Sequence, residues 1–451
     1  MIQQNNSSEQ TKIQLLQAFK ALGIAKILRN SGIRKATGTS AFEVFKFLFL
    51  LVFQGKNLYR YLDSNRSDKA CSKNTYYRFL NESTFNWRRF LLTLSTKVIS
   101  SISKLTRASR VRVLVLDDSV VARNRSKSVE LLARGYDHAS HKYYKGFTML
   151  SLGWSDGYSF IPVDFAMLSS ANEKNRYCEI DPSIDKRTSG YKRRLESMMK
   201  KTDAAVNLVK NALSTGIQAD YVLMDTWFTS EPMIKSMLHE GIDVIGMVKD
   251  INQKYHYNGE LHTLKELKKA LPKVKNKSIL GSVITKTKKG IPVKIVFVAN
   301  RTNDSKWLAI LSTDITLTDD EIVRIYGNRW SIEVFFKSIK SFMKLGSEFQ
   351  GRSYDMMISH TTIVYSRYIL LEWLRREEKD QKTFGELFFK FCDDIQDIDL
   401  ATALQSLMGL FVEHINAVSE SIDSMKNQLQ YWIDQQASFI KALFMDLCWE
   451  S

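Results

Sequence analysis

The chain has 451 residues, 44% of them hydrophobic, which is enough to build more than one buried core. Its net charge of +17 is unevenly spread: residues 1–106 hold 17 Lys and Arg against 5 Asp and Glu, whereas residues 377–451 hold 5 against 14. The longest apolar run, 42–53, is too short to span a bilayer, and the four cysteines show no metal-ligand spacing, so we expect neither a membrane protein nor a disulfide-rich or zinc-binding one. The polar N-terminus lacks a signal-peptide pattern, which predicts a cytoplasmic protein, and the basic body favours a polyanionic partner.

Residues 1–106 are predicted to be helical and to form a DNA-binding region. A capping-box pattern at 40–43 opens a buried helix along the apolar run. A short helix at 72–80 carries Lys73 and Arg78 among aromatic residues. Short basic helices are typical of a helix-turn-helix DNA reader, but an ordinary helical bundle with a basic surface fits the same pattern.

From residue 111 the period of the apolar residues changes, and short buried strands alternate with helices. The turn residues at 155–157 predict a hairpin. We expect strands at 111–116, 145–154, 158–167, 221–224 and 242–248, and helices at 203–214 and 230–241. This order of elements predicts a mixed α/β sheet.

Residues 249–310 interrupt this pattern and are predicted to form a basic, β-rich insertion. Lysines are dense in it, and its apolar residues alternate as they do in strands with one buried face. Strands are expected at 278–286, 293–299 and 306–311. Beyond the sheet, residues 376–451 are predicted to form an acidic helical region.

A polar, mixed-charge stripe is predicted on a helix in the last third of the chain. At about 100° per residue, four side chains fall within roughly 60° of one another: Tyr326, Arg329, Glu333 and Lys340. The opposite face is apolar and is predicted to be buried. Such a stripe is often only a solvated face with weak ion pairs, but a carboxylate between Arg and Lys also suits metal-assisted chemistry on a polyanion. A break in the helix at Gly327 would take Tyr326 off the stripe.

Two aspartates follow predicted strands, at the point where each strand ends. They are Asp118 and Asp225, and the third acid that we single out is Glu333 on the stripe. Because the carboxyl ends of strands in α/β sheets meet at one edge, we expect the two aspartates to converge there; the three acids lie in different elements, so only the fold can bring Glu333 to them. Two Asp and one Glu can hold two Mg²⁺ ions through oxygen ligands. Asp117 directly precedes Asp118, and the sequence barely separates these two neighbours; closing a loop is the commoner role of a single Asp at such a position.

The motifs around these acids resemble those of bacterial insertion-sequence transposases of the DDE class. The pattern Y-x2-R-x3-E-x6-K at 326–340 matches the Tyr-Arg-Glu-Lys signature of one group of them. Asp-Asp-Ser at 117–119 resembles the first-acid motif of this group, and Asp-Thr-Trp-Phe at 225–228 resembles the second. The similarity covers roughly 107–375, and a basic β-rich insertion before the third acid belongs to it.

The resemblance implies an RNase H-like catalytic core at 107–375 and a Mg²⁺-dependent cut-and-paste reaction, with Mn²⁺ as a substitute. In such motifs the acid directly before the Ser is usually the ligand, so the resemblance nominates Asp118, Asp225 and Glu333 as metal ligands. The reaction would cleave DNA at the ends of the element and transfer the freed 3′-hydroxyl to target DNA.

The resemblance also implies DNA-contacting residues and partners. Tyr326, Arg329 and Lys340 would contact phosphates near the cleaved bond, and Trp307, on the strand that leaves the insertion, would hold a flipped base. The alternative role for Trp307 is that of a core residue beneath the insertion. Double-stranded DNA is then the partner, as terminal inverted repeats and target. The protein would work as a homodimer on paired ends in the bacterial cytoplasm, at the nucleoid and away from membranes.

Two other functions remain open from the sequence. One is a metal-dependent nuclease that cuts DNA without strand transfer. The other is a domesticated DNA-binding protein without catalysis, although a pure binder would gain nothing from three converging carboxylates that repel one another.

Overall fold

The computed structural model describes most of the chain and divides it into two compact units, Leu15–Lys390 and Met1–Gln14 with Phe391–Ser451. Apart from isolated positions near the C-terminus, the described residues are 17–63, 71–107, 109–137, 140–250, 253–272, 278–300, 306–347, 351–377 and 382–393. Most of the predicted acidic helical region, 376–451, therefore lies outside the described residues. No helix among the described residues combines the length and the apolar character that a membrane crossing needs.

The N-terminal region is helical, as predicted. Its helices are α2 (Ile24–Asn30), α3 (Ala41–Leu50), α4 (Leu58–Leu62), α5 (Lys73–Leu80) and α6 (Trp87–Leu105). The Ser40 hydroxyl accepts a hydrogen bond from the Glu43 backbone N–H at 3.2 Å and so caps α3 where the capping pattern was recognised. Aromatic rings form the core between these helices; for example, the Phe45 ring lies 5.3 Å from that of Phe90.

The centre of the protein is a mixed sheet that contains 11 strands among the described residues. Its first six strands are β1 (Val113–Ala122), β2 (Ala133–Asp137), β3 (Lys142–Ser155), β4 (Phe160–Leu168), β5 (Tyr221–Met224) and β6 (Asp243–Val248). The sheet order is β2-β3-β1-β5-β6, β4 pairs with β3, and β1, β5 and β6 are parallel to one another. The predicted fold class is therefore confirmed, and the sheet is consistent with an RNase H-like core.

One strand differs from its expected bounds in a way that matters for the site. The predicted strand 111–116 was expected to end before the Asp-Asp-Ser motif, but β1 continues to Ala122. It does so because β3 is long and pairs with β1 along its whole length, from Val113 opposite Ser155 to Ala122 opposite Gly146. The acids of this motif consequently lie inside a strand, and their side chains alternate between the two faces of the sheet.

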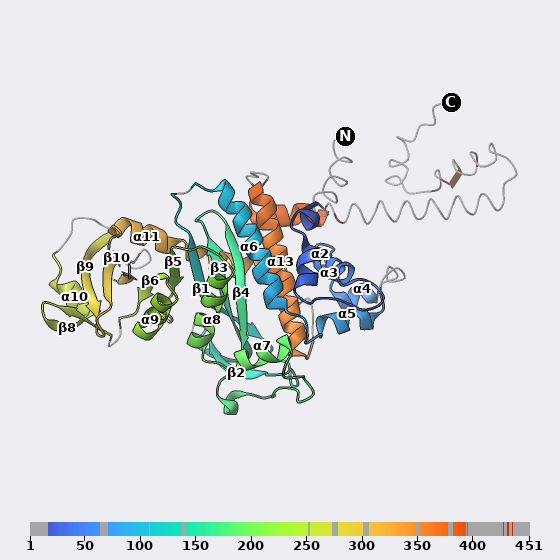
Figure 1. Cartoon of the computed structure of the whole chain (residues 1–451), viewed down its shortest axis with the longest axis horizontal. Coiled ribbons are helices and arrows are strands. Elements are labelled where there is room, and N and C mark those ends of the chain that lie inside the picture. Colours follow the sequence, from blue (N-terminus) through green and yellow to red (C-terminus); the bar gives the residue numbers. More distant parts are fainter. Residues whose placement is uncertain are drawn as a thin grey trace. The chain divides into compact units, whose positions relative to one another are not determined.

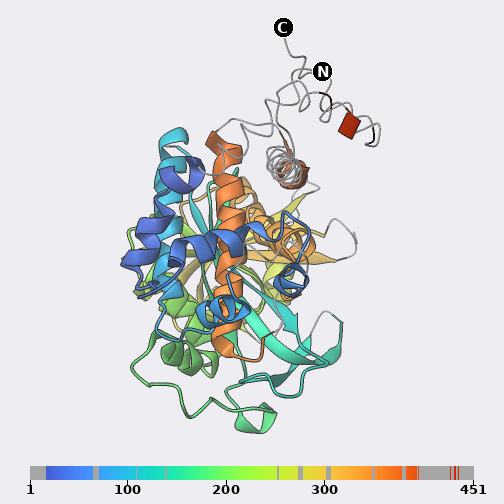
Figure 2. The same cartoon turned by 90° about the vertical axis from the view of Figure 1, so that its right-hand side faces the viewer.

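The helices pack on the sheet and on each other. The other main helices are α7 (Ser189–Ser197), α8 (Lys201–Ser214), α9 (Glu231–His239) and α13 (Tyr354–Glu377). Figures 1 and 2 show α13 running alongside α6, and both helices contact β4. The N-terminal helices join this layer through Arg367 of α13, whose guanidinium donates to the carbonyl oxygens of Leu48 and Phe49 at the end of α3.

The lysine-rich segment is β-rich, as predicted, and it extends the central sheet. It comprises β7 (Lys254–Tyr257), β8 (Glu260–Thr263), α10 (Leu264–Ala270), β9 (Ile279–Thr287), β10 (Pro292–Ala299) and β11 (Trp307–Ser312). Strand β11 pairs antiparallel with β6, so the insertion and the core share one continuous hydrogen-bonded ladder. The chain then forms α11 (Asp319–Gly327) and α12 (Trp330–Ser341).

Buried ion pairs tie these layers together. The guanidinium of Arg194, on α7, binds Glu130 at 2.6 and 2.8 Å and Asp355, at the start of α13, at 2.8 and 3.0 Å. A second arginine, Arg88 of α6, reaches Asp164 on β4 and Glu196 on α7. Each arginine therefore joins elements that are far apart in the sequence.

Replacing Arg194 by Met should strongly destabilise the protein. The side chain of Arg194 is 1% exposed, and its removal would leave two buried carboxylates without a counter-charge, which typically costs about 3–5 kcal/mol. Chemical denaturation should show this loss in the free energy of unfolding. The control is Arg187→Met, which removes a 90% exposed guanidinium paired with Asp185 and should leave the free energy of unfolding nearly unchanged. Similar values for both variants would contradict a structural role of the buried network.

Candidate catalytic site

The first two acids are brought together by neighbouring parallel strands. β1 pairs with β5 from Val113 opposite Tyr221 to Leu116 opposite Met224, and β5 ends there. The next residues along the two strands are Asp117 and Asp225. Side chains at facing positions of adjacent strands point to the same face of a sheet, so Asp117 shares a face with Asp225, whereas Asp118 points to the other face.

Arg329 connects the acid on β1 to the acid on α12. Its Nη1 donates to Asp117 Oδ2 at 2.9 Å, and its Nη2 donates to Glu333 Oε1 one helical turn further on. Glu333 and Arg329 therefore face the strand that carries Asp117, as the stripe prediction requires. The stripe is not a merely solvated face, because Arg329 is largely buried against β1.

The close approach of acidic groups changes the protonation of Asp117. Burial raises the pKa of Asp117 to about 7, and repulsion by Asp225 and Asp118 adds to the increase, while Arg329 and a hydrogen bond from the Asp118 backbone N–H oppose it. A carboxyl group with such a pKa gains a bound cation or a proton more readily than an ordinary surface carboxyl group does.

Tyr326 belongs to the same group of side chains although the helix breaks beside it. Helix α11 ends at Gly327, and the chain crosses to α12 through hydrogen bonds of the tighter i to i+3 type, such as Arg329 N to Tyr326 O at 3.0 Å. The Tyr326 side chain is buried there. Burial raises its pKa to about 12; Arg329 opposes the increase, and the charges of Asp225 and Asp117 add to it. Tyr326 therefore lies on α11, a different helix from the one that carries Glu333, but it stays beside the acids.

Asp118 has a different partner. Its Oδ1 accepts a hydrogen bond from Lys201 Nζ, on α8, at 2.8 Å. The same ammonium group lies 3.5 Å from the ring centre of Trp227, two residues after Asp225. Sequence reasoning missed Lys201, for which no motif signals a role, and overlooked Trp227 inside the second-acid motif.

Asp225 is held by its own loop. Its Oδ1 accepts hydrogen bonds from the backbone N–H groups of Trp227 and Phe228, at 3.0 and 3.2 Å. The Thr229 hydroxyl donates to the Asp225 carbonyl oxygen at 2.7 Å. This local turn fixes the carboxylate at the end of β5, so Asp225 combines the loop-closing role expected for many such aspartates with a place beside Asp117.

The remaining predicted site residues, Lys340 and Trp307, have partners other than the three acids. Lys340 Nζ donates to the Ser119 hydroxyl at 2.5 Å, which places the last turn of α12 beside β1. Burial lowers the pKa of Lys340, and the charge of Asp137 opposes this effect. Trp307 stands at the start of β11, half-buried, with its ring 5.3 Å from that of Phe297 and 5.1 Å from Lys268 Nζ. These contacts of Trp307 are all within the insertion.

The acids have the right chemistry to bind a hard divalent cation, but their side chains are not spaced to bind one in this structure. Carboxylate oxygens are the ligands that Mg²⁺ prefers. Among the described residues, however, no group of three or more His, Cys, Asp or Glu side chains is close enough together to hold a metal ion. The Arg329 guanidinium lies between Asp117 and Glu333 and supplies the positive charge there, so a bound cation would have to replace its contacts with these carboxylates.

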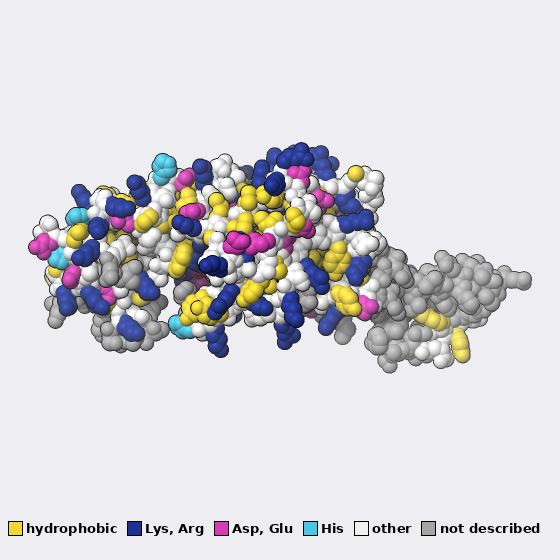
Figure 3. Space-filling view, turned by 90° about the horizontal axis from the view of Figure 1, so that it is seen from below, with side chains coloured by type: hydrophobic (Ala, Val, Ile, Leu, Met, Phe, Trp, Pro, Cys, Tyr) yellow, Lys and Arg dark blue, Asp and Glu magenta, His cyan; other side chains and the backbone are white. Residues whose placement is uncertain are grey.

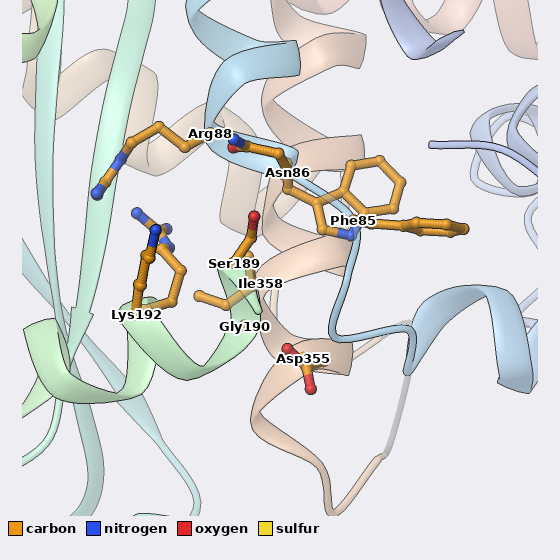
Figure 4. Close-up of a pocket in the computed structure, with 10 residues that line it drawn as sticks. Phe85, Asn86, Arg88, Ser189, Gly190, Lys192, Asp355 and Ile358 are labelled. Carbon is orange, nitrogen blue, oxygen red and sulfur yellow. The ribbon is translucent and has the colours of Figure 1, made fainter. Parts of the chain in front are cut away.

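A cavity elsewhere in the protein is lined by none of the predicted site residues. It has a volume of about 190 Å³ and lies where α6, α7 and α13 meet. Figure 4 shows Arg88 and Lys192 on one side of it and Asp355 at its lower edge. Because Arg88 and Asp355 are both engaged in the buried ion pairs described above, this cavity belongs to the structural network.

Two family models match parts of the chain. Residues 35–268 match the family described as DDE superfamily endonuclease, and residues 200–357 match the transposase DDE domain. The first match covers just over half of the chain, so the chain belongs to the DDE superfamily of endonucleases. The two matches together span Asp117, Asp225 and Glu333. No curated protein matches the chain significantly. The protein is therefore a nucleic-acid-cleaving enzyme of the DDE type, a superfamily that generally uses divalent metal ions.

Replacing Asp117 by Asn should stabilise the metal-free protein at pH 8. Because the pKa of Asp117 in the folded protein is raised to about 7, the charged form is held less favourably than in the unfolded chain, and stability falls as the pH rises from about 4 to 7. At pH 8 the neutral Asn should therefore increase the free energy of unfolding by about 1–3 kcal/mol, and the gain should shrink towards pH 4.

The matched control for this prediction is Asp118→Asn, which removes the partner of Lys201 instead. Denaturation of the EDTA-treated proteins at several pH values measures both effects. If the Asp117 variant lost as much stability at pH 8 as the control does, Asp117 would not be the carboxyl group whose charged form is unfavourable in the folded protein.

Proposed function

We propose that this DDE enzyme is a transposase that cleaves DNA at the ends of an insertion sequence and joins the freed 3′-hydroxyl to target DNA. The observation that carries the proposal is the arrangement of Asp117 and Asp225 on neighbouring parallel strands, with Glu333 linked to Asp117 through Arg329. The match of residues 200–357 to the transposase DDE domain supports it.

Asp117, Asp225 and Glu333 are the residues that we propose as ligands of two Mg²⁺ ions, with Mn²⁺ as a substitute. Asp118, which the sequence motif nominates, is the alternative first ligand. We favour Asp117 because the carboxylate of Asp118 is already paired with Lys201. Bound ions would supply an activated water or hydroxyl group and would stabilise the leaving oxygen of the phosphodiester.

The basic residues beside the acids suit the binding of phosphate. The guanidinium of Arg329 can donate two N–H groups to a phosphate once its hydrogen bonds to the carboxylates of Asp117 and Glu333 are broken. Lys340 adds a single positive charge beside Ser119. Tyr326, buried next to Arg329, would orient this guanidinium and contact the same phosphate, and Trp307 would stack on a base that leaves the duplex.

The proposed partner is double-stranded DNA, as terminal inverted repeats and as target. Figure 3 shows Lys and Arg side chains spread over one face of the protein around a small group of acidic side chains. The net charge of +17 acts in the same sense, because a polyanion is attracted to such a surface. Pairing of two DNA ends would require a homodimer, and the bacterial cytoplasm, at the nucleoid, would provide the substrate.

A nuclease that cuts without strand transfer is the second candidate, because the longer family match is described as an endonuclease. The two functions share the cleavage step and differ in what happens to the 3′-end. A plasmid that carries the coding region with its natural flanking DNA distinguishes them. Incubation with Mg²⁺ should give fragments cut at the flanks and products joined to a second plasmid, and cleavage without joined products would reject the transposase in favour of the nuclease.

Glu333→Gln should abolish cleavage of this plasmid while DNA binding persists. The substitution keeps the size of the side chain but removes a charge that a divalent cation needs, and it leaves the basic residues in place. The control is Glu260→Gln on β8, whose highly exposed carboxylate lies in the insertion. Cleavage at the wild-type rate by the Glu333 variant would refute its role as a ligand.

Divalent cations should raise the melting temperature of the wild-type protein in the absence of DNA, because binding to the folded state alone stabilises that state. Titration with Mg²⁺ and with Mn²⁺ should give a concentration-dependent increase that EDTA reverses. The increase should be lost in Asp225→Asn and in Asp117→Asn, and it should persist in Asp118→Asn. Persistence in the Asp117 variant with loss in the Asp118 variant would favour the motif-based assignment instead.

A further inference from the structure

Strands β2 and β3 extend past the acids as a two-stranded arm, which consists of Ala133–Asp137 and Lys142–Gly146. Within it, Arg134 pairs with Lys145 and Tyr136 pairs with Tyr143 across the strands. Because side chains alternate along a strand, these two pairs lie on the same face of the arm. We call this face the outer face of the β2–β3 arm.

The other face of the arm is turned towards the protein. Tyr144 lies there across Gly135, where a Cβ atom would come within 2.3 Å of the Tyr144 ring. The Tyr144 hydroxyl shares a hydrogen bond with that of Thr148 at 2.7 Å. The glycine therefore lets the tyrosine pack flat, and this packing sets which face of the arm remains exposed.

The outer face combines cations with exposed aromatic rings. The Arg134 guanidinium lies 3.8 Å from the ring centre of Tyr143, and the Tyr143 ring lies 5.1 Å from that of Tyr136. Lys145 Nζ lies 4.9 Å from the ring centre of Tyr177. The three tyrosines are 40–65% exposed. Cross-strand pairs of this kind stabilise a hairpin, and that role alone would explain the ring contacts.

Hairpin stability does not explain the uncompensated charge. Among the described residues, Arg134, Lys142 and Lys145 form no ion pair with an acidic side chain. The guanidinium of Arg134 stacks on the ring of Tyr143, and this contact restricts its conformational freedom. A cation that is ordered in advance binds an anion at a lower entropic cost.

The arm is also next to the catalytic site. Gly146, at its base, pairs with Ala122 of β1, five residues along the strand from Asp117, or roughly 17 Å. The charge of Asp137, at the end of β2, acts on Lys340 of α12. A DNA duplex that places a phosphodiester at the acids can thus reach the arm about half a helical turn away.

We propose that the outer face of the β2–β3 arm binds the phosphate backbone of duplex DNA beside the cleaved bond. Arg134 and Lys145 contact phosphates, and Tyr143 holds Arg134 in the orientation that it needs. The contact is with the backbone and is therefore independent of base sequence. The role of this DNA as the flank of a cleavage site rests on the proposed function, whereas the binding itself does not.

The test measures binding of a labelled mixed-sequence DNA duplex to the full-length protein over a range of salt concentrations. Two lost phosphate contacts should reduce the slope of log K against log salt concentration by about 2 in the double variant Arg134→Ala/Lys145→Ala, with about tenfold weaker binding near physiological salt. Tyr143→Ala should weaken binding less, and it should change the slope by about 1 or less.

Matched controls separate this effect from the loss of charge or of an exposed ring. The double variant Lys210→Ala/Lys235→Ala removes two exposed lysines, on α8 and α9. Tyr158→Ala removes a tyrosine that is 66% exposed beneath Arg110, at the far end of β3. Both controls should bind DNA with the wild-type slope.

An unchanged slope in the Arg134/Lys145 variant, or an equal loss in the lysine control, would overturn the proposal. Circular dichroism and the melting temperature verify folding; the Arg134/Lys145 variant retains the Tyr136–Tyr143 pair, so it tests the proposal even if Tyr143→Ala unfolds the arm. If the arm variants cleave and bind DNA like the wild-type protein, the proposal for the arm is rejected and the proposed function is not. Binding through the arm without any cleavage would reject the proposed function alone.

Discussion

Repulsion between carboxylates is the constraint around which this protein is organised. Asp117 and Asp225 stand at facing positions of parallel strands, and burial with mutual repulsion raises the pKa of Asp117 to about 7. Such an arrangement is unfavourable unless positive charge is close by. Arg329 provides this charge from α12 and thereby docks the helix that carries Glu333 onto β1. The guanidinium that offsets this repulsion thus also holds Glu333 beside Asp117.

The surrounding fold makes that arrangement rigid. Arg88 and Arg194 are buried and link α6, β4, α7 and the start of α13, elements that the chain order keeps far apart. Pairs of this kind contribute little net stability compared with apolar packing, but they tolerate only one geometry, because a misplaced partner leaves a buried charge. The sheet that carries the acids is therefore held in a single relation to the helices behind it, and positioning of reactive groups depends on such support.

Sequence reasoning succeeded where structure is determined locally. The end of β5 and the position of Asp225 were predictable, because a short apolar run and a turn-forming motif define both. The length of β1 was not, since it depends on pairing with β3 across a long connection. The pairing of β1 with β5 is also non-local, and its register decides whether Asp117 or Asp118 faces Asp225. The contact of Lys201 with Asp118 is equally non-local and carries no signature in the chain.

The pairing of β11 with β6 attaches the insertion rigidly to the core, whereas a domain on a flexible tether could move independently. The insertion is joined through β6 to β5, the strand that precedes Asp225, by backbone hydrogen bonds, so its strands keep a fixed register with the core sheet. Changes in the length of the β7–β8 hairpin would alter only the edge of the sheet that is farthest from β6. Deleting one residue within β11 would instead turn its side chains to opposite faces, Trp307 among them. The attachment of this segment to the core is thus sensitive to length changes in β11 and insensitive to those in the β7–β8 hairpin.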